Sequence, residues 1–409
     1  MDRAATGATL LLPLFLLHGR GIAEALLLMV AALFLLRSAL LRDWAWVRGW
    51  VLVAAAWWGW LVLCSVPVGW AETAQAAGVA RFLLLVAALE HWVLRQDWVR
   101  RWLGRLLAWS ALYIAAQSLL QFATGRNAFG YPRGADGELT GPYQNPRAGA
   151  PLSRLLFPAV LPLLDRLATQ GRAWAALLLL PAGVAVMVLI GQRMPLLLTL
   201  LGLFVTGLLL PRLRRFVLAG SGAVLGLLVL TSVASPPTFN RLVTKFTSQM
   251  EHFPDSHYGQ IAARAVNIAQ AHPWTGSGFD GFRRLCDDPA FFGGWRTGAG
   301  PAGDGGGAAM CVQHPHNFYL QALVEGGWPG LLLFTALAAA WLLRLFRGLW
   351  HEPDALRVGL FVAALIQLWP VASTTAFTSM PLSGWFFVLL GLGLAHAQHY
   401  ITGPNVERA

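Results

Sequence analysis

Three groups of polar residues interrupt an otherwise apolar chain, and their types suit phosphate binding and proton transfer. Arg193 and the neighbouring Gln192 follow one apolar run, Arg264 lies in a long polar segment, and residues 314–317 (His-Pro-His-Asn) directly precede another apolar run. Arginine is always charged and offers its donors in a fork that matches phosphate oxygens. A neutral histidine can accept a proton near pH 7. The three groups therefore form a candidate site, provided that the fold brings them together.

Each group also has a simpler interpretation. Arg193 could be an interfacial arginine whose charged head reaches water, and Arg264 could be a solvated helix residue. His314 and His316 could be ordinary loop histidines or an alternate-residue metal pair. Because no HExxH motif or CxxC pair accompanies the histidines, we expect neither a metal nor another cofactor.

Two segments resemble the O-antigen ligase and polymerase superfamily. Residues 314–330, HPHNFYLQALVEGGWPG, resemble its signature xHNxxLxxxxExGxxG. Residues 140–150, TGPYQNPRAGA, resemble its loop GxFxNPNxxA, with Asn145 retained and Arg147 where asparagine is common. An arginine after a mid-chain helix and one large loop before the third-last helix also match this family.

The resemblance implies a glycosyltransferase that moves a glycan from undecaprenyl pyrophosphate to a hydroxyl of the lipid A core. The reaction would take place on the periplasmic face of a bacterial inner membrane. By motif, His316 matches the histidine of the family, and Arg193 and Arg264 match its two arginines. The implied partners are the lipid-linked glycan donor, the lipid A-core acceptor and membrane lipids.

Such a transfer needs two things, because a sugar pyrophosphate already carries a good leaving group. Charge on the departing pyrophosphate must be stabilised, and a base must accept the proton of the attacking hydroxyl. Arginines can do the first task in place of a divalent metal, and histidine suits the second. We therefore expect a metal-independent reaction, and direct displacement would invert the anomeric carbon.

His316 is the better candidate for the base. Pro315 favours an extended backbone, so the side chains of His314 and His316 are expected to project on opposite sides. Asn317 and the helix that follows would hold His316 in place, which leaves His314 a supporting role. The residues expected to contact substrate besides the catalytic three are His314, Asn317, Gln192, Arg147, Asn145, Arg241 and Lys245.

The composition determines the fold class. Of 409 residues, 56% are hydrophobic and only 12% are charged, about half the charge of a soluble domain. A soluble enzyme and a disordered chain are thereby excluded. Basic residues mark cytoplasmic loops, so we attribute the net charge of +11 to membrane topology and expect no nucleic acid partner. The chain is predicted to be an all-α, polytopic transmembrane bundle.

Twelve apolar helices are predicted, and arginine-rich loops between them place both termini in the cytoplasm. Residues 1–233 would form helices one to nine, residues 234–316 a large periplasmic loop with catalytic residues, and residues 317–409 a re-entry segment and the last three helices. The predicted spans are 7–18, 22–40, 49–67, 76–95, 102–123, 151–168, 173–191, 194–211, 214–233, 327–346, 356–376 and 380–400.

The large loop is expected to contain two helices. Over 237–250, Phe239, Leu242, Val243 and Phe246 recur at helical spacing with Arg241 and Lys245 nearby, which is typical of a helix on a membrane surface. A second helix is predicted over 258–271, with Arg264 beside its apolar face. The glycine-rich residues 298–310 are expected to form a mobile flap without regular structure.

Two of the three cysteines, Cys286 and Cys311, share the large loop. If the loop is periplasmic, its compartment permits a disulfide, and we predict one between them. Two free thiols are the alternative, because the sequence does not show that their Cα atoms are within reach.

Two other classes of function remain open. An O-antigen polymerase or a protein O-oligosaccharyltransferase of the same superfamily would share the arginine and histidine chemistry and differ only in the acceptor. A lipid-linked glycan transporter or flippase would place ionisable groups near the membrane midplane. Glu24, Glu90 and Asp165 are possible groups of this kind, although they are scattered along the chain.

Overall fold

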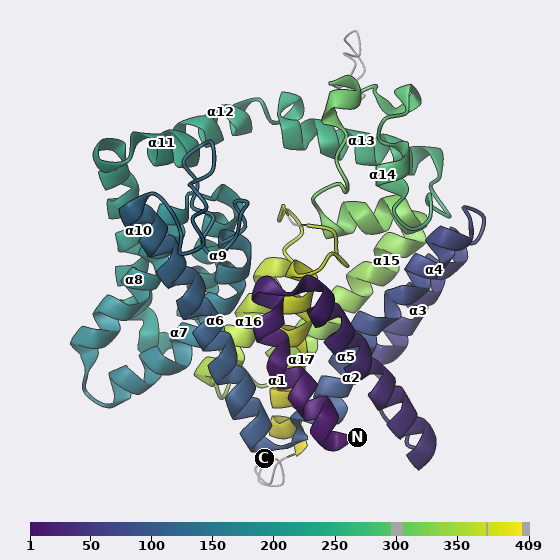
Figure 1. The fold of residues 1–409 in the computed structure, drawn as a ribbon, viewed down its shortest axis with the longest axis horizontal. Coiled ribbons are helices and arrows are strands. Elements are labelled where there is room, and N and C mark those ends of the chain that lie inside the picture. The colour runs from purple at the N-terminus through teal and green to yellow at the C-terminus, as the bar shows by residue number, and fades with distance from the viewer. Residues whose placement is uncertain (296–305, 374, 403–409) are drawn as a thin grey trace.

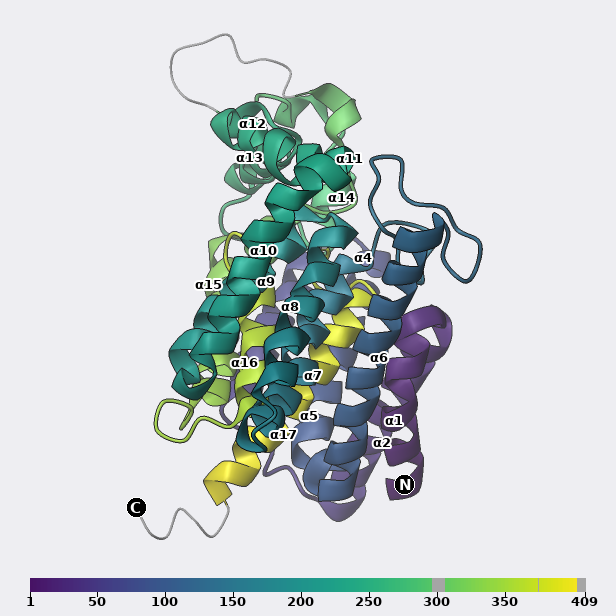
Figure 2. The same ribbon diagram turned by 90° about the vertical axis from the view of Figure 1, so that its left-hand side faces the viewer.

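Long helices stand side by side, and shorter helices lie across one end of them (Figure 1). The computed structural model describes residues 1–295, 306–373 and 375–402. Within these ranges the regular secondary structure is helical, apart from one isolated β-bridge between Arg126 and Pro132. α1 begins and α17 ends at the end of the bundle opposite to the short helices (Figures 1 and 2).

Each of the twelve predicted spans overlaps a helix of this bundle. Six helical stretches in the described residues are long and apolar enough to cross a membrane, which supports a multi-pass membrane protein; the number of crossings stays a prediction. The helices are α1 (Asp2–His18), α2 (Arg20–Leu41), α3 (Trp50–Ser65), α4 (Trp70–Gly78), α5 (Ala80–His91), α6 (Asp97–Thr124), α7 (Gly149–Thr169), α8 (Ala173–Ile190), α9 (Arg193–Leu209), α10 (Arg214–Ala234), α15 (Phe318–Phe346), α16 (Ala355–Gln367) and α17 (Leu382–Thr402).

Two predicted spans differ from the helices. The span 76–95 is divided at Val79, between α4 and α5, and the span 356–376 is helical only as far as Gln367. After Gln367 the chain turns, and residues 370–373 come to lie beside the start of α15, where Pro370 and Ala372 accept hydrogen bonds from Asn317. An apolar composition identifies the buried segment but does not show where the helix ends within it.

Close packing of α7 against α16 fixes the position of α7 in the bundle. A Cβ at Gly359 would lie 2.8 Å from the backbone oxygen of Phe157, closer than a real Cβ contact. Glycine at this position therefore lets the two helix backbones touch, and a larger residue would push α7 away. Phe157 itself is fully buried.

The short helices of the large loop form a layer over the bundle, which we call the cap. It comprises α11 (Pro236–Phe239), a π-helical turn (Asn240–Thr244), α12 (Lys245–Glu251), α13 (His257–Ala271) and α14 (Gly281–Leu285). Both predicted loop helices are present. The first is a continuous helical segment over 236–251, in which Leu242 is buried, Phe239, Val243 and Phe246 are half-buried, and Met250 is exposed. Its contact with a membrane stays a prediction.

Two details of the loop and re-entry segment depart from expectation. Residues 298–305 of the predicted flap lie outside the described residues, whereas Gly307–Met310 form a short 3-10 helix. α15 starts nine residues before the predicted span, at Phe318, and is kinked at Gly327, where φ is +62°. The predicted start at residue 327 therefore marks a kink that glycine permits, and the helix itself begins at the His-Asn motif.

Candidate functional site

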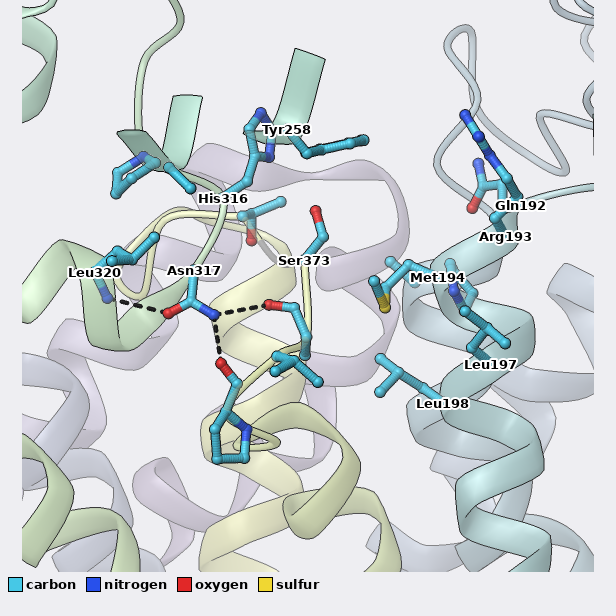
Figure 3. Close-up of a pocket in the computed structure, with 18 of the residues that line it drawn as sticks. Gln192, Arg193, Met194, Leu197, Leu198, Tyr258, His316, Asn317, Leu320 and Ser373 are labelled. Carbon is cyan, nitrogen blue, oxygen red and sulfur yellow. Dashed lines mark hydrogen bonds between the residues drawn. The ribbon is translucent and has the colours of Figure 1, made fainter. Parts of the chain in front are cut away.

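A cavity of about 750 Å³ opens between the bundle and the cap. Helices α7, α9, α12, α13 and α15, residues 370–373 and Thr375 contribute to its wall. His316, Tyr258 and Ser373 lie on one side, and Gln192, Arg193, Met194, Leu197 and Leu198 lie on the other (Figure 3). One side therefore carries the histidine of the His-Asn motif, and the opposite side carries an arginine above an apolar surface.

His316 is held in position by Asn317, the next residue along the chain. Its backbone has a φ of +54°, a conformation that non-glycine residues rarely adopt. Asn317 accepts hydrogen bonds from the backbone nitrogens of Tyr319 and Leu320, at 2.9 and 3.0 Å, and so caps α15. Its amide nitrogen donates to Pro370 and Ala372. Both ends of this amide are therefore engaged with backbone. Asn317 also lines the cavity, and its contact with a substrate stays a prediction.

The expectation that His314 and His316 project on opposite sides is wrong. Their rings meet edge to face with centroids 4.3 Å apart. The left-handed turn at His316 is the reason, because it reverses the direction that an extended backbone after Pro315 would give. His314 does not line the cavity. Burial, with a smaller effect from the charge on His316, lowers the pKa of His314 to about 4, so His314 is neutral at pH 7.

Arg193 is the first residue of α9, and its side chain lines the cavity. Its guanidinium donates to the side-chain oxygen of Gln249 on α12, which ties the bundle to the cap. Gln192, just before it, accepts from the backbone nitrogen of Gly149 at 3.0 Å and donates to the carbonyl of Pro146 at 2.8 Å. Gln192 thus joins the start of α9 to the start of α7.

Arg241 also lines the cavity, and it is ion-paired. It bonds to Asp136 at 2.9 Å and to Glu138, both in the segment between α6 and α7. Lys245 lies 3.8 Å from Asp136 and does not line the cavity. Burial raises the pKa of Glu138, while Arg241 opposes that change. The positive charge of Arg241 is therefore already partly neutralised by two carboxylates when an anion enters the cavity.

Asn145 and Arg147 are exposed and do not line the cavity, whereas Pro146 between them does. The NPR turn therefore contributes its proline ring and a backbone carbonyl to the site. Contact of the Asn145 and Arg147 side chains with a substrate stays a prediction.

The fold does not bring Arg264 into the cavity with Arg193 and His316. Arg264 is 2% exposed, and its guanidinium donates to the carbonyls of Cys286, at 2.6 Å, and Gly307, at 2.8 Å. It also lies over the ring of Phe292, 4.3 Å from the centroid. Helix α13 turns this residue toward the interior of the cap, whereas Tyr258 and Ala262 of the same helix line the cavity.

Cys286 and Cys311 are joined by a disulfide, with their Cα atoms 5.4 Å apart. The bond closes the loop between α14 and the segment that leads to His314. Because Arg264 binds the carbonyl of Cys286, the arginine and the disulfide hold the same part of the cap together.

The sequence analysis missed several residues of the cavity wall, among them Arg154, Gln249 and Tyr258. Arg154 lies in the apolar helix α7, and Gln249 binds Arg193. The ring of Tyr258 packs edge to face on that of His316, with the ring centroids 5.6 Å apart. A charged residue inside an apolar span is itself a signal of function, and it could have identified Arg154. No pattern in the sequence identifies Gln249 or Tyr258.

The three carboxylates considered for a transport pathway are each paired with an arginine. Glu24 binds Arg81, Asp165 binds Arg212 at 2.6 Å, and Glu90 binds Arg344 at 2.8 Å. The cavity lining includes none of the three. Each pairing therefore joins two segments of the bundle, which favours a structural role for these carboxylates.

Residues 174–335 match the model of the O-antigen ligase family. The match includes Arg193, Arg264 and His316, the whole cap and the first part of α15. It supports membership of the chain in the O-antigen ligase superfamily. No curated protein matches the sequence.

Proposed function

We propose that the protein transfers a glycan from undecaprenyl pyrophosphate to the lipid A core. The proposal rests on the match to the O-antigen ligase family. The observation that carries the proposal is the cavity that His316 and Arg193 face from opposite sides (Figure 3). Its polar wall suits a diphosphate and a sugar, and the apolar surface formed by Met194, Leu197 and Leu198 suits the polyprenyl chain.

Arg193 is the proposed electrostatic partner of the diphosphate. Its guanidinium stands at the N-terminus of α9, where the helix dipole also favours an anion. Arg241, which lines the same cavity, is the second guanidinium in this proposal. We assign Arg264 a different task, because its buried contacts with Cys286 and Gly307 hold the cap in shape.

His316 is the proposed base. The acceptor hydroxyl oxygen attacks the anomeric carbon, the bond between that carbon and the diphosphate oxygen breaks, and the diphosphate takes the electron pair. His316 takes the hydroxyl proton. A single displacement of this kind inverts the configuration of the anomeric carbon. The positive charges of Arg193 and Arg241 stabilise the negative charge that develops on the leaving group. The reaction so described uses no metal ion.

The proposed place of the reaction is the periplasmic face of a bacterial inner membrane, with both termini in the cytoplasm. α1 starts and α17 ends at the end of the bundle away from the cap (Figure 1), and the arginine-rich loops are assigned to the cytoplasm. This orientation would open the cavity to the compartment where a flipped lipid-linked glycan is found.

The test uses purified protein, undecaprenyl pyrophosphate carrying a glycan, and three separate acceptors with EDTA present. Ligation to lipid A core is the expected result. Extension of the glycan itself, or transfer to a hydroxyl of a protein, would instead identify a polymerase or an oligosaccharyltransferase. Loss of transfer in EDTA, restored by a divalent cation, would contradict the metal-independent reaction.

A further inference from the structure

A buried arginine lies deeper in the cavity than the residues so far assigned. Arg154 is in α7, is 4% exposed, and contributes to the cavity wall. Ser153, its neighbour along the chain, and Gln367 of α16 line the same cavity. None of these residues takes part in the proposed reaction, so their presence needs a separate explanation.

The depth of Arg154 follows from the contact between the two helix starts. Gln192, just before α9, binds the backbone nitrogen of Gly149, the first residue of α7, so α7 and α9 begin at the same level. Arg193 is the first residue of α9, whereas Arg154 is five residues into α7. At a rise of about 1.5 Å per residue, Arg154 lies roughly 7 Å further into the bundle.

The charge of Arg154 is poorly compensated. Its Nη1 donates to the backbone carbonyl of Leu382 at 2.6 Å, and no carboxylate in the described parts of the chain forms an ion pair with it. A guanidinium has five donors and stays charged. Burying it against one neutral carbonyl is costly, and an anion in the cavity would offset that cost.

We propose that Arg154 forms a second anion-binding point in this cavity, below Arg193, that holds a phosphate or carboxylate group of a substrate. The inference deepens the proposed function, since that function supplies two sources for the group. One is the diphosphate of the lipid donor, and the other is an anionic substituent on the acceptor saccharide. Gln367, whose side chain lines the same cavity, is a further donor that could bind the anion.

A binding experiment tests the subsite without requiring transfer. Inorganic pyrophosphate is titrated calorimetrically into full-length protein in detergent, as wild type and as Arg154→Gln, Arg154→Lys and Arg100→Gln. We expect Arg154→Gln to weaken binding about 10- to 100-fold and Arg154→Lys to weaken it less, because lysine keeps the charge but loses the fork. Equal affinity of wild type and Arg154→Gln would overturn the proposal.

Arg100→Gln is the matched control. Arg100 is also buried, at 5% exposure, and also donates to a backbone carbonyl, that of Leu94 at 2.6 Å, but it does not line the cavity. Its loss should leave pyrophosphate affinity unchanged. If both glutamine variants lower the melting temperature and neither alters pyrophosphate affinity, Arg154 only braces α7 against α17 and the subsite does not exist.

Transfer kinetics then assign the source of the anion. A raised KM for the lipid donor alone assigns the group to the diphosphate. A raised KM for the acceptor, absent when the acceptor is first stripped of phosphate, assigns it to the acceptor. A protein that transfers no glycan, yet binds pyrophosphate through Arg154, would refute the proposed function and leave the subsite intact, so the two failures are distinguishable.

Discussion

The rings of His314 and His316 touch edge to face, 4.3 Å between centroids, although a proline separates the two residues. One ring lines the cavity and the other does not. The pair therefore combines one histidine exposed to substrate with one that supports it from behind, and the two positions should respond differently to substitution.

Replacing His316 by alanine is expected to lower kcat by about 10²- to 10⁴-fold, because a positioned general base contributes this much. Replacing His314 by glutamine, which can still accept a hydrogen bond from the backbone nitrogen of His316, should lower kcat far less. Single-turnover transfer assays measure both. A fully active His316→Ala would exclude His316 as the base, and a more severe loss at His314 would reverse the assignment.

The stability of the protein should depend on pH through His314. Its folded pKa is about 4, mainly because of burial, and its unfolded pKa is about 6.5. A lowered folded pKa stabilises the fold above the unfolded value, and this contribution is lost as pH falls through the folded value. Partial exposure limits the effect to about 2 kcal/mol. The melting temperature should therefore fall between pH 6.5 and 4, and less steeply in His314→Gln. If the melting temperatures of the wild type and of His314→Gln fell equally steeply over this pH range, His314 would not be the cause.

Much of the fold could be predicted, because long apolar runs have few alternatives in a membrane. Every predicted span overlaps a helix, and both helices of the large loop are present. Helix ends were harder to predict. The segment after the end of α16 at Gln367 is held by a residue distant in sequence, because Asn317 donates to the carbonyls of residues 370 and 372.

The site could be predicted only in part, for a physical reason that differs from residue to residue. Arg193 and His316 were identifiable because polar residues beside an apolar run are costly without a purpose. The interior position of Arg264 depends on carbonyls of residues 286 and 307, and helical spacing does not reveal them. The contact of His314 with His316 depends on a positive φ, which histidine rarely adopts.

Arg193→Lys should lower transfer by about 10²-fold, since lysine keeps a charge but cannot bind phosphate oxygens through two parallel donors. The matched control is Arg212→Lys. Arg212 pairs with Asp165 through two hydrogen bonds at the opposite end of the α9 region, and it does not line the cavity. Wild-type transfer by Arg193→Lys would mean that Arg193 anchors α9 to Gln249 and does not bind the diphosphate.

Asn317 should affect activity through position. Asn317→Ala removes the cap of α15, which costs about 1 kcal/mol, and also releases residues 370 and 372. Asn317→Ser keeps a cap acceptor but cannot donate to those two carbonyls. We therefore expect the serine variant to melt near the wild-type temperature and yet to transfer more slowly, because the 370–373 segment forms part of the cavity wall. Equal activity of serine variant and wild type would limit Asn317 to capping.

Arg264 and the disulfide should stabilise the cap as one unit. Closing the 25-residue separation between Cys286 and Cys311 contributes about 3 kcal/mol in the chain-entropy account, and Arg264 fixes the carbonyl of Cys286. Cys286→Ser with Cys311→Ser, and separately Arg264→Gln, should each make the cap more sensitive to limited proteolysis. When the two changes are combined, the increase in cleavage rate should be smaller than the sum of the separate increases, because Arg264 and the disulfide hold the same segment. Arg212→Gln, which breaks the pair with Asp165 away from the cap, should leave the proteolysis pattern unchanged. If Arg264→Gln abolished transfer with the cap still resistant to protease, Arg264 would act on substrate directly, and the arrangement around Cys286 would have to open during the reaction.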